Sequence, residues 1–145
     1  MKNEGFSLIE LIIVVAIMAI LVAIIAPNLT KYLSSSKEQT DNRNIDEVKH
    51  QVLNCISEAA GKGIAVIDKT SGAVEAYYKM EYDSSTGGAK AVSVTDGVSD
   101  FADLLTETLE EANTVSSKDR TKNKMEIKIS ESVNKGYDVS VRYTS

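Results

Sequence analysis

The sequence contains few residues of several informative types. Its 145 residues include one cysteine, one proline and no tryptophan. A single cysteine excludes an internal disulfide, so any folded part must be held by its hydrophobic core. The 16 Lys and Arg are outnumbered by 21 Asp and Glu, which gives a net charge of −5. A surface that follows a phosphate backbone needs an excess of basic residues, so we expect no nucleic acid as a partner of the folded part of the chain.

Side chains suited to catalysis or metal binding are also scarce. His50 and Cys55 lie five positions apart on an expected helix, about 140° around its axis, so they do not face each other. Cys55 fits an apolar stripe, whereas His50 fits a solvated helix surface. One Cys and one His are too few for a structural zinc site. The acids Asp96, Asp100 and Asp103 could ligate calcium, but they fit no loop template and helix capping explains them better. The sequence therefore predicts no enzyme, no catalytic residue, no cofactor and no metal site.

What the chain does have is one long apolar run near its N-terminus. Every residue from Leu11 to Ala26 is apolar. The segment from Phe6 to Ile25 would form a helix of about 30 Å, which is about the thickness of the hydrocarbon core of a bilayer. Glu10 is the one charged residue between Phe6 and Thr30.

Three interpretations of this run compete. A secretory signal peptide needs a basic start and a small-x-small exit. At the start, the negative charge of Glu4 offsets the positive charge of Lys2. At the exit, Ile24 is not small, and Pro27 would follow the cut directly. A plain membrane anchor explains the length and lets Glu10 snorkel to the headgroups, but it gives neither Glu10 nor Pro27 a role. In the third interpretation, the helix is stable first in lipid and later in a protein assembly.

Glu10 favours the third interpretation. A carboxylate in a membrane helix costs about 2.5–3.5 kcal/mol at the bilayer centre and less near the helix end. An amine created by a cut before Phe6 would supply the opposite charge, either in the same chain or in a second chain offset along the helix axis. Such a pair is strong in a low dielectric and would set the register of helix against helix.

The segment GFSLIELIIVVAIMAILVAIIAP closely resembles the N-terminus of type IV pilins and prepilin-like proteins of the N-methylphenylalanine class, and type IV major pilins in particular. This resemblance covers about the first 30 residues. It implies that prepilin peptidase cuts the leader after Gly5 and that the same enzyme methylates the new N-terminal residue, Phe6. It also implies that Glu10 neutralises the N-terminal amine of a neighbouring subunit during assembly, and that Pro27 breaks or kinks the helix.

The chain departs from the family pattern in three ways. Its leader, MKNEG, holds one lysine where the family usually has a more basic leader. Lys31 and Lys37 follow the span, so the positive-inside count is ambiguous. The single cysteine also excludes the C-terminal disulfide loop of many Gram-negative pilins, which favours a pilin of another group, such as a Gram-positive one.

Pro27 allows two local structures. A proline inside a helix removes a backbone hydrogen bond and pushes on the carbonyl of Ala23, at a cost of about 3 kcal/mol. Pro27 is therefore either the first residue of a fresh helix or a weak point in a continuous one.

The rest of the chain predicts an α+β head. One stripe of a helix ending near Gly61 and Gly63 consists of Ile45, Val48, Val52, Cys55, Ile56 and Ala59, so one long helix could run from about Phe6 to Ala60, interrupted near Pro27. Alternating segments predict strands at 73–82, 89–95, 125–130 and 137–143. A helix at 99–112, capped by Ser99 or Asp100, would bury Phe101, Leu104, Leu105 and Leu109. The fold class is thus a long N-terminal helix packed on a four-stranded antiparallel sheet.

These expectations divide the chain into a leader (1–5), a transmembrane or filament-core helix (6–27) and a globular head (28–145). The resemblance implies a structural subunit of a type IV pilus, a helical homo-oligomer at the cell surface that serves adhesion, motility or DNA uptake. Its implied partners are membrane lipid before assembly, prepilin peptidase, an assembly platform protein and an ATPase. The alternatives are a pseudopilin of type II secretion or competence and, in another class, a monomeric membrane-anchored adhesin.

Overall fold

The computed structural model describes residues 7–83, 88–110, 124–134 and 136–144. Its contacts divide the chain into two compact units, one extending to Glu38 and the other beginning at Gln39. The predicted boundary after residue 27 concerns burial in lipid or in a filament, which a division by contacts does not test, so it stays a prediction.

The first helix, α1 (Leu8–Lys62), contains 55 residues and contributes to both units. Pro27 lies inside α1, so the continuous helix is observed rather than a fresh helix that begins at this proline. The predicted interruption near Pro27 is therefore not a break in the helix. A ring at this position still removes one backbone N–H, the donor that would reach Ala23.

The end of α1 follows the predicted glycines. Gly63 has a left-handed φ of 70°, a conformation that glycine adopts without a Cβ penalty. The N–H of Ile64 donates to the carbonyl of Ala59 (2.9 Å) and that of Gly63 donates to Ala60 (3.3 Å). This is a Schellman motif, which satisfies carbonyls that the helix end would leave unpaired.

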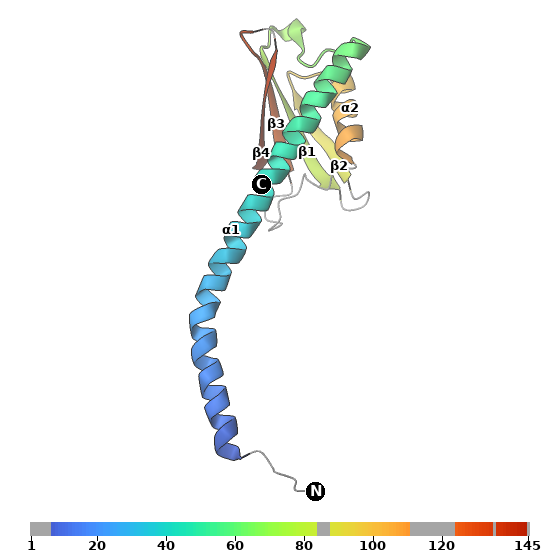
Figure 1. Ribbon diagram of the computed structural model, residues 1–145. Coiled ribbons are helices and arrows are strands. Elements are labelled where there is room, and N and C mark those ends of the chain that lie inside the picture. The colour runs from blue at the N-terminus through green and yellow to red at the C-terminus, as the bar shows by residue number, and fades with distance from the viewer. Residues whose placement is uncertain (1–6, 84–87, 111–123, 135, 145) are drawn as a thin grey trace. The chain divides into compact units, whose positions relative to one another are not determined.

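Four antiparallel strands form the sheet of the second unit: β1 (Glu75–Asp83), β2 (Gly88–Thr95), β3 (Lys124–Glu131) and β4 (Tyr137–Thr144). Their order is β2-β1-β3-β4, so the two hairpins join through β1 and β3 (Figure 1). The register places Tyr78 opposite Ile127, and Ile127 opposite Val141, which aligns the apolar faces of three strands. The predicted α+β class is confirmed.

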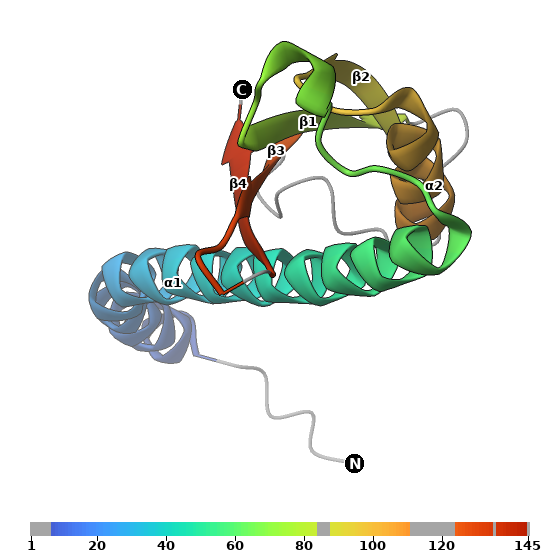
Figure 2. The same cartoon turned by 90° about the horizontal axis from the view of Figure 1, so that it is seen from above.

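The second half of α1 and the helix α2 (Ser99–Glu110) lie on the same face of this sheet (Figure 2). The predicted apolar side of α2 is confirmed, because Phe101, Leu104, Leu105 and Leu109 are all buried. The predicted cap is wrong: Val98 precedes the helix and accepts the first helical hydrogen bond, from the N–H of Ala102 (3.1 Å). The N–H of Val98 itself donates a hydrogen bond to a tyrosine of β1.

That tyrosine, Tyr78, lies at the centre of the core. It is fully buried, and its ring meets Phe101 edge to face at 5.3 Å between centroids. Its hydroxyl accepts a hydrogen bond from the N–H of Val98 (3.0 Å) and donates to the carbonyl of Val66. A short 3-10 helix, Lys69–Ser71, that the sequence did not predict follows Val66, and Asp68 caps it.

Candidate functional site

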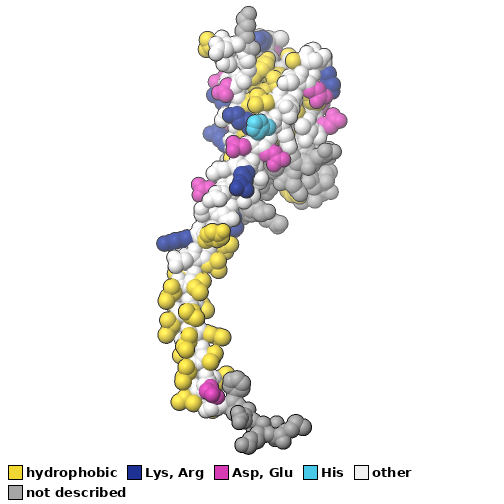
Figure 3. Space-filling view, viewed as in Figure 1, with side chains coloured by type: hydrophobic (Ala, Val, Ile, Leu, Met, Phe, Trp, Pro, Cys, Tyr) yellow, Lys and Arg dark blue, Asp and Glu magenta, His cyan; other side chains and the backbone are white. Residues whose placement is uncertain are grey.

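The part of α1 that precedes Pro27 exposes an apolar surface on all sides. Each large apolar side chain from Leu8 to Ile25 is between 45% and 76% exposed, and Figure 3 shows these side chains covering the visible face. Surface patches of this extent mark contact with a membrane or with protein. An 18-residue window of α1 has a mean hydropathy of 3.3 and no buried residue. By length and composition, it is the one helix in the described part of the chain that could cross a membrane.

Glu10 lies in the first turn of this helix and has a contact that the sequence analysis missed. The backbone N–H of Ser7 donates to Glu10 Oε2 at 2.9 Å. Since α1 begins at Leu8, Ser7 and Glu10 occupy the two positions of a capping box, S-x-x-E. The helix dipole also favours a carboxylate at this end. The spacing of Ser7 and Glu10 was a signal available in the sequence.

The structure leaves the other predicted site residues untested or apart from Glu10. Gly5 and Phe6 lie outside the described residues, so cleavage after Gly5 and methylation of Phe6 stay predictions. Pro27 lies 17 positions after Glu10 in the same helix, so the structure does not bring the two together.

The turn of helix after Pro27 contains two polar side chains that bond to the backbone. Asn28 Nδ2 donates to the carbonyl of Ile24 (3.2 Å), and Thr30 Oγ1 donates to the carbonyl of Pro27 (3.0 Å). Both side chains therefore have hydrogen-bond partners within their own helix. Side-chain donors of this kind allow a helix to tolerate polar residues in an apolar environment.

The structure separates the two residues considered for nucleophilic chemistry. Cys55 is 1% exposed, and its thiol donates to Thr108 Oγ1 at 3.1 Å. Burial raises the pKa of the Cys55 thiol more than this hydrogen bond lowers it, which keeps the thiol protonated. His50 is exposed on the same helix. In the described part of the chain, no three His, Cys, Asp or Glu residues are grouped so that they could hold a metal ion.

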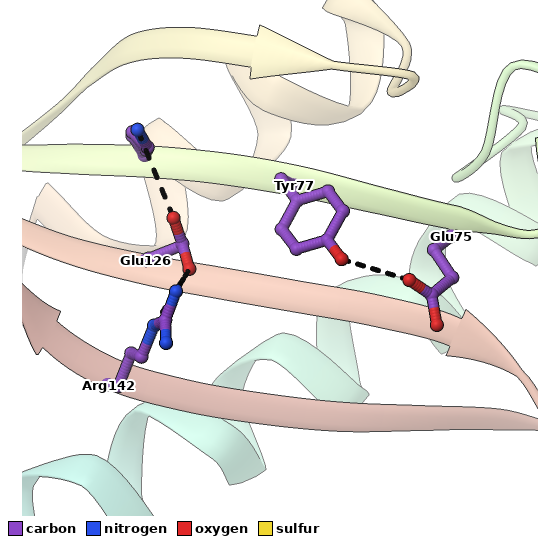
Figure 4. Close-up of polar contacts among 5 residues, drawn as sticks. Glu75, Tyr77, Glu126 and Arg142 are labelled. Atoms are coloured by element: carbon purple, nitrogen blue, oxygen red, sulfur yellow. Dashed lines mark hydrogen bonds and ion pairs between the residues drawn. The ribbon is translucent and has the colours of Figure 1, made fainter.

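Charged side chains on the outer face of the sheet pair with one another. Arg142 Nε donates to Glu126 Oε1 at 2.8 Å, and Lys79 Nζ lies 3.9 Å from Glu126 Oε2 (Figure 4). Along the same strands, Lys128 Nζ lies 2.8 Å from a carboxylate oxygen of Glu75. Hydrogen bonds from Lys128 and, less strongly, from Tyr77 lower the pKa of that carboxyl. These pairs join neighbouring strands, so their role is to stabilise the sheet.

Comparison with known proteins gives two kinds of match. Residues 1–26 match the family model described as the prokaryotic N-terminal methylation motif. Prepilin peptidase-dependent protein A of Clostridium perfringens (strain 13 / Type A) is 33% identical over 106 residues, which are 72% of this chain and 67% of that protein. Type IV major pilin protein PilA of Myxococcus xanthus (strain DK1622) is 50% identical over 44 residues, 30% of this chain and 20% of that protein. No solved structure matches the chain significantly.

Proposed function

Because the chain belongs to the family of type IV pilins and prepilin-like proteins, we propose that it is the structural subunit of a type IV pilus filament. The precursor inserts in the membrane through the first half of α1, and prepilin peptidase cuts it after Gly5 and methylates Phe6. A membrane platform protein and a cytoplasmic ATPase then move the subunit into a helical fibre at the cell surface. There it serves adhesion, motility or DNA uptake.

The observation that carries this proposal is the exposed apolar half of α1. Burying the side chains from Leu11 to Ala26 out of water is worth on the order of 25 kcal/mol as an upper bound, so this surface is stable only in lipid or among copies of itself. Lipid and a protein core are similarly apolar, so transfer from one to the other yields little hydrophobic free energy. Extraction of the helix from the membrane must therefore be driven by another source of free energy, which supports a role for an ATPase.

Glu10 sets the register of the fibre in this proposal. Cleavage after Gly5 frees the amine of Phe6, and the amine of one subunit pairs with the carboxylate of the next. In the described structure, the Ser7 amide bonds one oxygen of Glu10, Oε2. The carboxylate has a second oxygen that can accept a charged donor.

The test compares Glu10→Ala with the wild type. We expect the variant to insert in the membrane normally but to lose surface filaments, measured by membrane fractionation and by electron microscopy of sheared fibres. Glu58→Ala is the matched control on the same helix, since Glu58 is exposed and pairs only with Lys62 among the described ion pairs. Filaments at the wild-type level in the Glu10→Ala strain would contradict the proposal, and so would an equal loss in both variants.

A second candidate function is a pseudopilin of type II secretion or competence. The name of the clostridial relative refers to dependence on prepilin peptidase, a property that fits a pseudopilin as well as a pilin. Deletion of the gene distinguishes the two: a pilin is required for visible surface fibres, whereas a pseudopilin is required for secretion or DNA uptake without them. A monomeric membrane-anchored adhesin, the third possibility, would be indifferent to Glu10→Ala.

A further inference from the structure

We infer that the lipid-contacting surface of α1 extends past Pro27, so that Lys31 and Tyr32 lie among the lipid headgroups on the far side of the membrane. The inference rests on the proposed membrane-inserted precursor. It moves the end of the lipid-contacting segment from Pro27 to the turn of helix that follows.

The first support is the length of the uncharged part of the helix. Leu11–Thr30 contains no charged residue, and Glu10 and Lys31 flank it. All of it is helical, and at 1.5 Å per residue it is about 30 Å long. This equals the typical thickness of the hydrocarbon core. A helix that fills the core with Leu11–Thr30 therefore places one charged residue at each interface.

The second support comes from the polar groups at the end of this segment. Hydrocarbon contains no water that could bond to Asn28 or Thr30, so each would be costly there unless it had a partner within the protein. Both side chains donate to carbonyls of their own helix, those of Ile24 and Pro27 respectively. Each bond lowers the cost of placing that side chain in lipid, although the Asn28 amide also has a second N–H and a carbonyl oxygen, which a position close to the headgroups can satisfy.

The third support is the continuation of the apolar surface after the proline. Leu29 is 51% exposed and Leu33 is 50% exposed. Tyr32 is 72% exposed. Tyrosine is enriched at the interface of membrane and water because its ring is apolar and its hydroxyl polar. The ammonium of Lys31 can reach lipid phosphates while its stem lies along the apolar surface.

The absence of tryptophan allows a depth measurement with one fluorophore per chain. Tyr32→Trp reports the inferred interface. Leu21→Trp reports the membrane interior, because position 21 lies about 16 Å from position 32 along the helix axis. Val74→Trp is the control in the second unit, where Val74 is 63% exposed. The full-length variants are reconstituted in phosphatidylcholine–phosphatidylglycerol vesicles whose acyl chains carry bromine either near the headgroup or near the methyl end. Far-UV circular dichroism confirms that all three are folded.

We expect the Tyr32→Trp fluorescence to be quenched more by the shallow bromine, and the Leu21→Trp fluorescence more by the deep bromine. The Val74→Trp fluorescence should be quenched by neither. Deep quenching of Leu21→Trp with no quenching of Tyr32→Trp would overturn this inference while leaving membrane insertion intact, since the helix would then leave lipid before Lys31. Stronger quenching of Tyr32→Trp by the deep bromine would overturn it as well, because the tyrosine would lie inside the hydrocarbon. An unquenched Leu21→Trp would overturn both this inference and the membrane-inserted precursor.

Discussion

At the scale of single residues, Tyr78 and Gly97 determine how the loops of the second unit close. The Tyr78 hydroxyl joins the segment that contains Val66 to the segment before α2. Gly97 makes room for it, because a Cβ built on Gly97 would lie 2.5 Å from both Cζ and Oη of Tyr78 and 2.7 Å from Val94 Cγ1. Such distances are too short for real contacts, and the fully buried ring has little space to move.

We therefore predict that Gly97→Ala destabilises the protein by about 2 kcal/mol, since overpacking of a filled core costs on the order of 1–3 kcal/mol. Denaturant unfolding followed by circular dichroism measures the change. Gly61→Ala is the control, since a Cβ at Gly61 meets nothing within 4 Å and alanine is preferred to glycine in a helix. It should leave stability unchanged or raise it slightly. A Gly97→Ala protein as stable as the wild type would show that the ring can move.

The same tyrosine predicts a pH dependence. Burial raises the pKa of Tyr78 from 10.0 to about 12. Below pH 10 the phenol is neutral in the folded and unfolded states alike, so its contribution to stability is fully present. Between pH 10 and 12 the unfolded state releases the proton and the folded state keeps it. Stability therefore falls as the pH rises through this window.

Thermal unfolding between pH 8 and pH 12 tests this dependence. In Tyr78→Phe, stability should be lower throughout because two hydrogen bonds are lost, and the alkaline slope should be smaller. Some slope should remain, because burial also raises the pKa of Tyr143. If both proteins lost stability equally between pH 10 and 12, Tyr78 would not be the group that titrates.

Strand alternation indicates the face on which Tyr78 lies, which it shares with Ala76 and Met80, but not its contacts. All three side chains are buried. The hydrogen bond to Val98 spans 20 positions, and it depends on where two loops meet, which no local pattern encodes. For the same reason, the short helix at Lys69–Ser71 and the Val98 cap of α2 were not predicted.

At the scale of elements, the pairing of β1 with β3 determines how the sheet is built. Within each hairpin, the turn residues between the strands favour the pairing of β1 with β2 and of β3 with β4. The central pairing connects strands separated by α2 and by residues the structure does not describe, so periodicity could not supply its register. That register puts Lys79 opposite Glu126, and Arg142 faces Glu126 from β4. Strand alternation puts Glu126 on the face of β3 opposite to that of the buried Met125 and Ile127, yet Glu126 is only 9% exposed.

We predict that this low exposure makes the Glu126–Arg142 pair worth more than the other ion pairs on the sheet. A double-mutant cycle with Glu126→Gln and Arg142→Gln should give a coupling of about 1 kcal/mol, because the hydrogen bonds are charge-assisted but the guanidinium is partly solvated. The matching cycle for Glu75 and Lys128 should give a smaller coupling that decreases with added salt, since the Glu75 side chain is 38% exposed whereas that of Glu126 is 11% exposed. Equal couplings in the two cycles would contradict the role given to burial.

At the scale of the whole molecule, the two units differ in what they need in order to be stable. The second unit has its own core of buried side chains from α1, α2 and all four strands. The apolar half of α1 has no such core, and its described large side chains are exposed. One chain therefore combines a unit that is packed by itself with a helix segment that requires lipid or other copies.

The predictions for Gly5, Phe6, Glu10 and Pro27 came from the spacing of these residues in the sequence rather than from packing. Glu10 was identified because one acid stands at the start of an apolar run, and the structure adds its bond to the Ser7 amide. Pro27 was predicted to break or kink α1, and the helix is not broken there, since it continues through Pro27 to Lys62. Cleavage and methylation are acts of another enzyme on residues outside the described range, so they must be measured directly.

The most direct measurement is the mass of the N-terminal peptide of protein recovered from sheared surface fibres. Our account predicts that the chain begins at Phe6 and carries one added methyl group on its amine. Fibres made of chains that retain residues 1–5 and an unmodified terminus would contradict it, because the amine that pairs with Glu10 would then never have been formed.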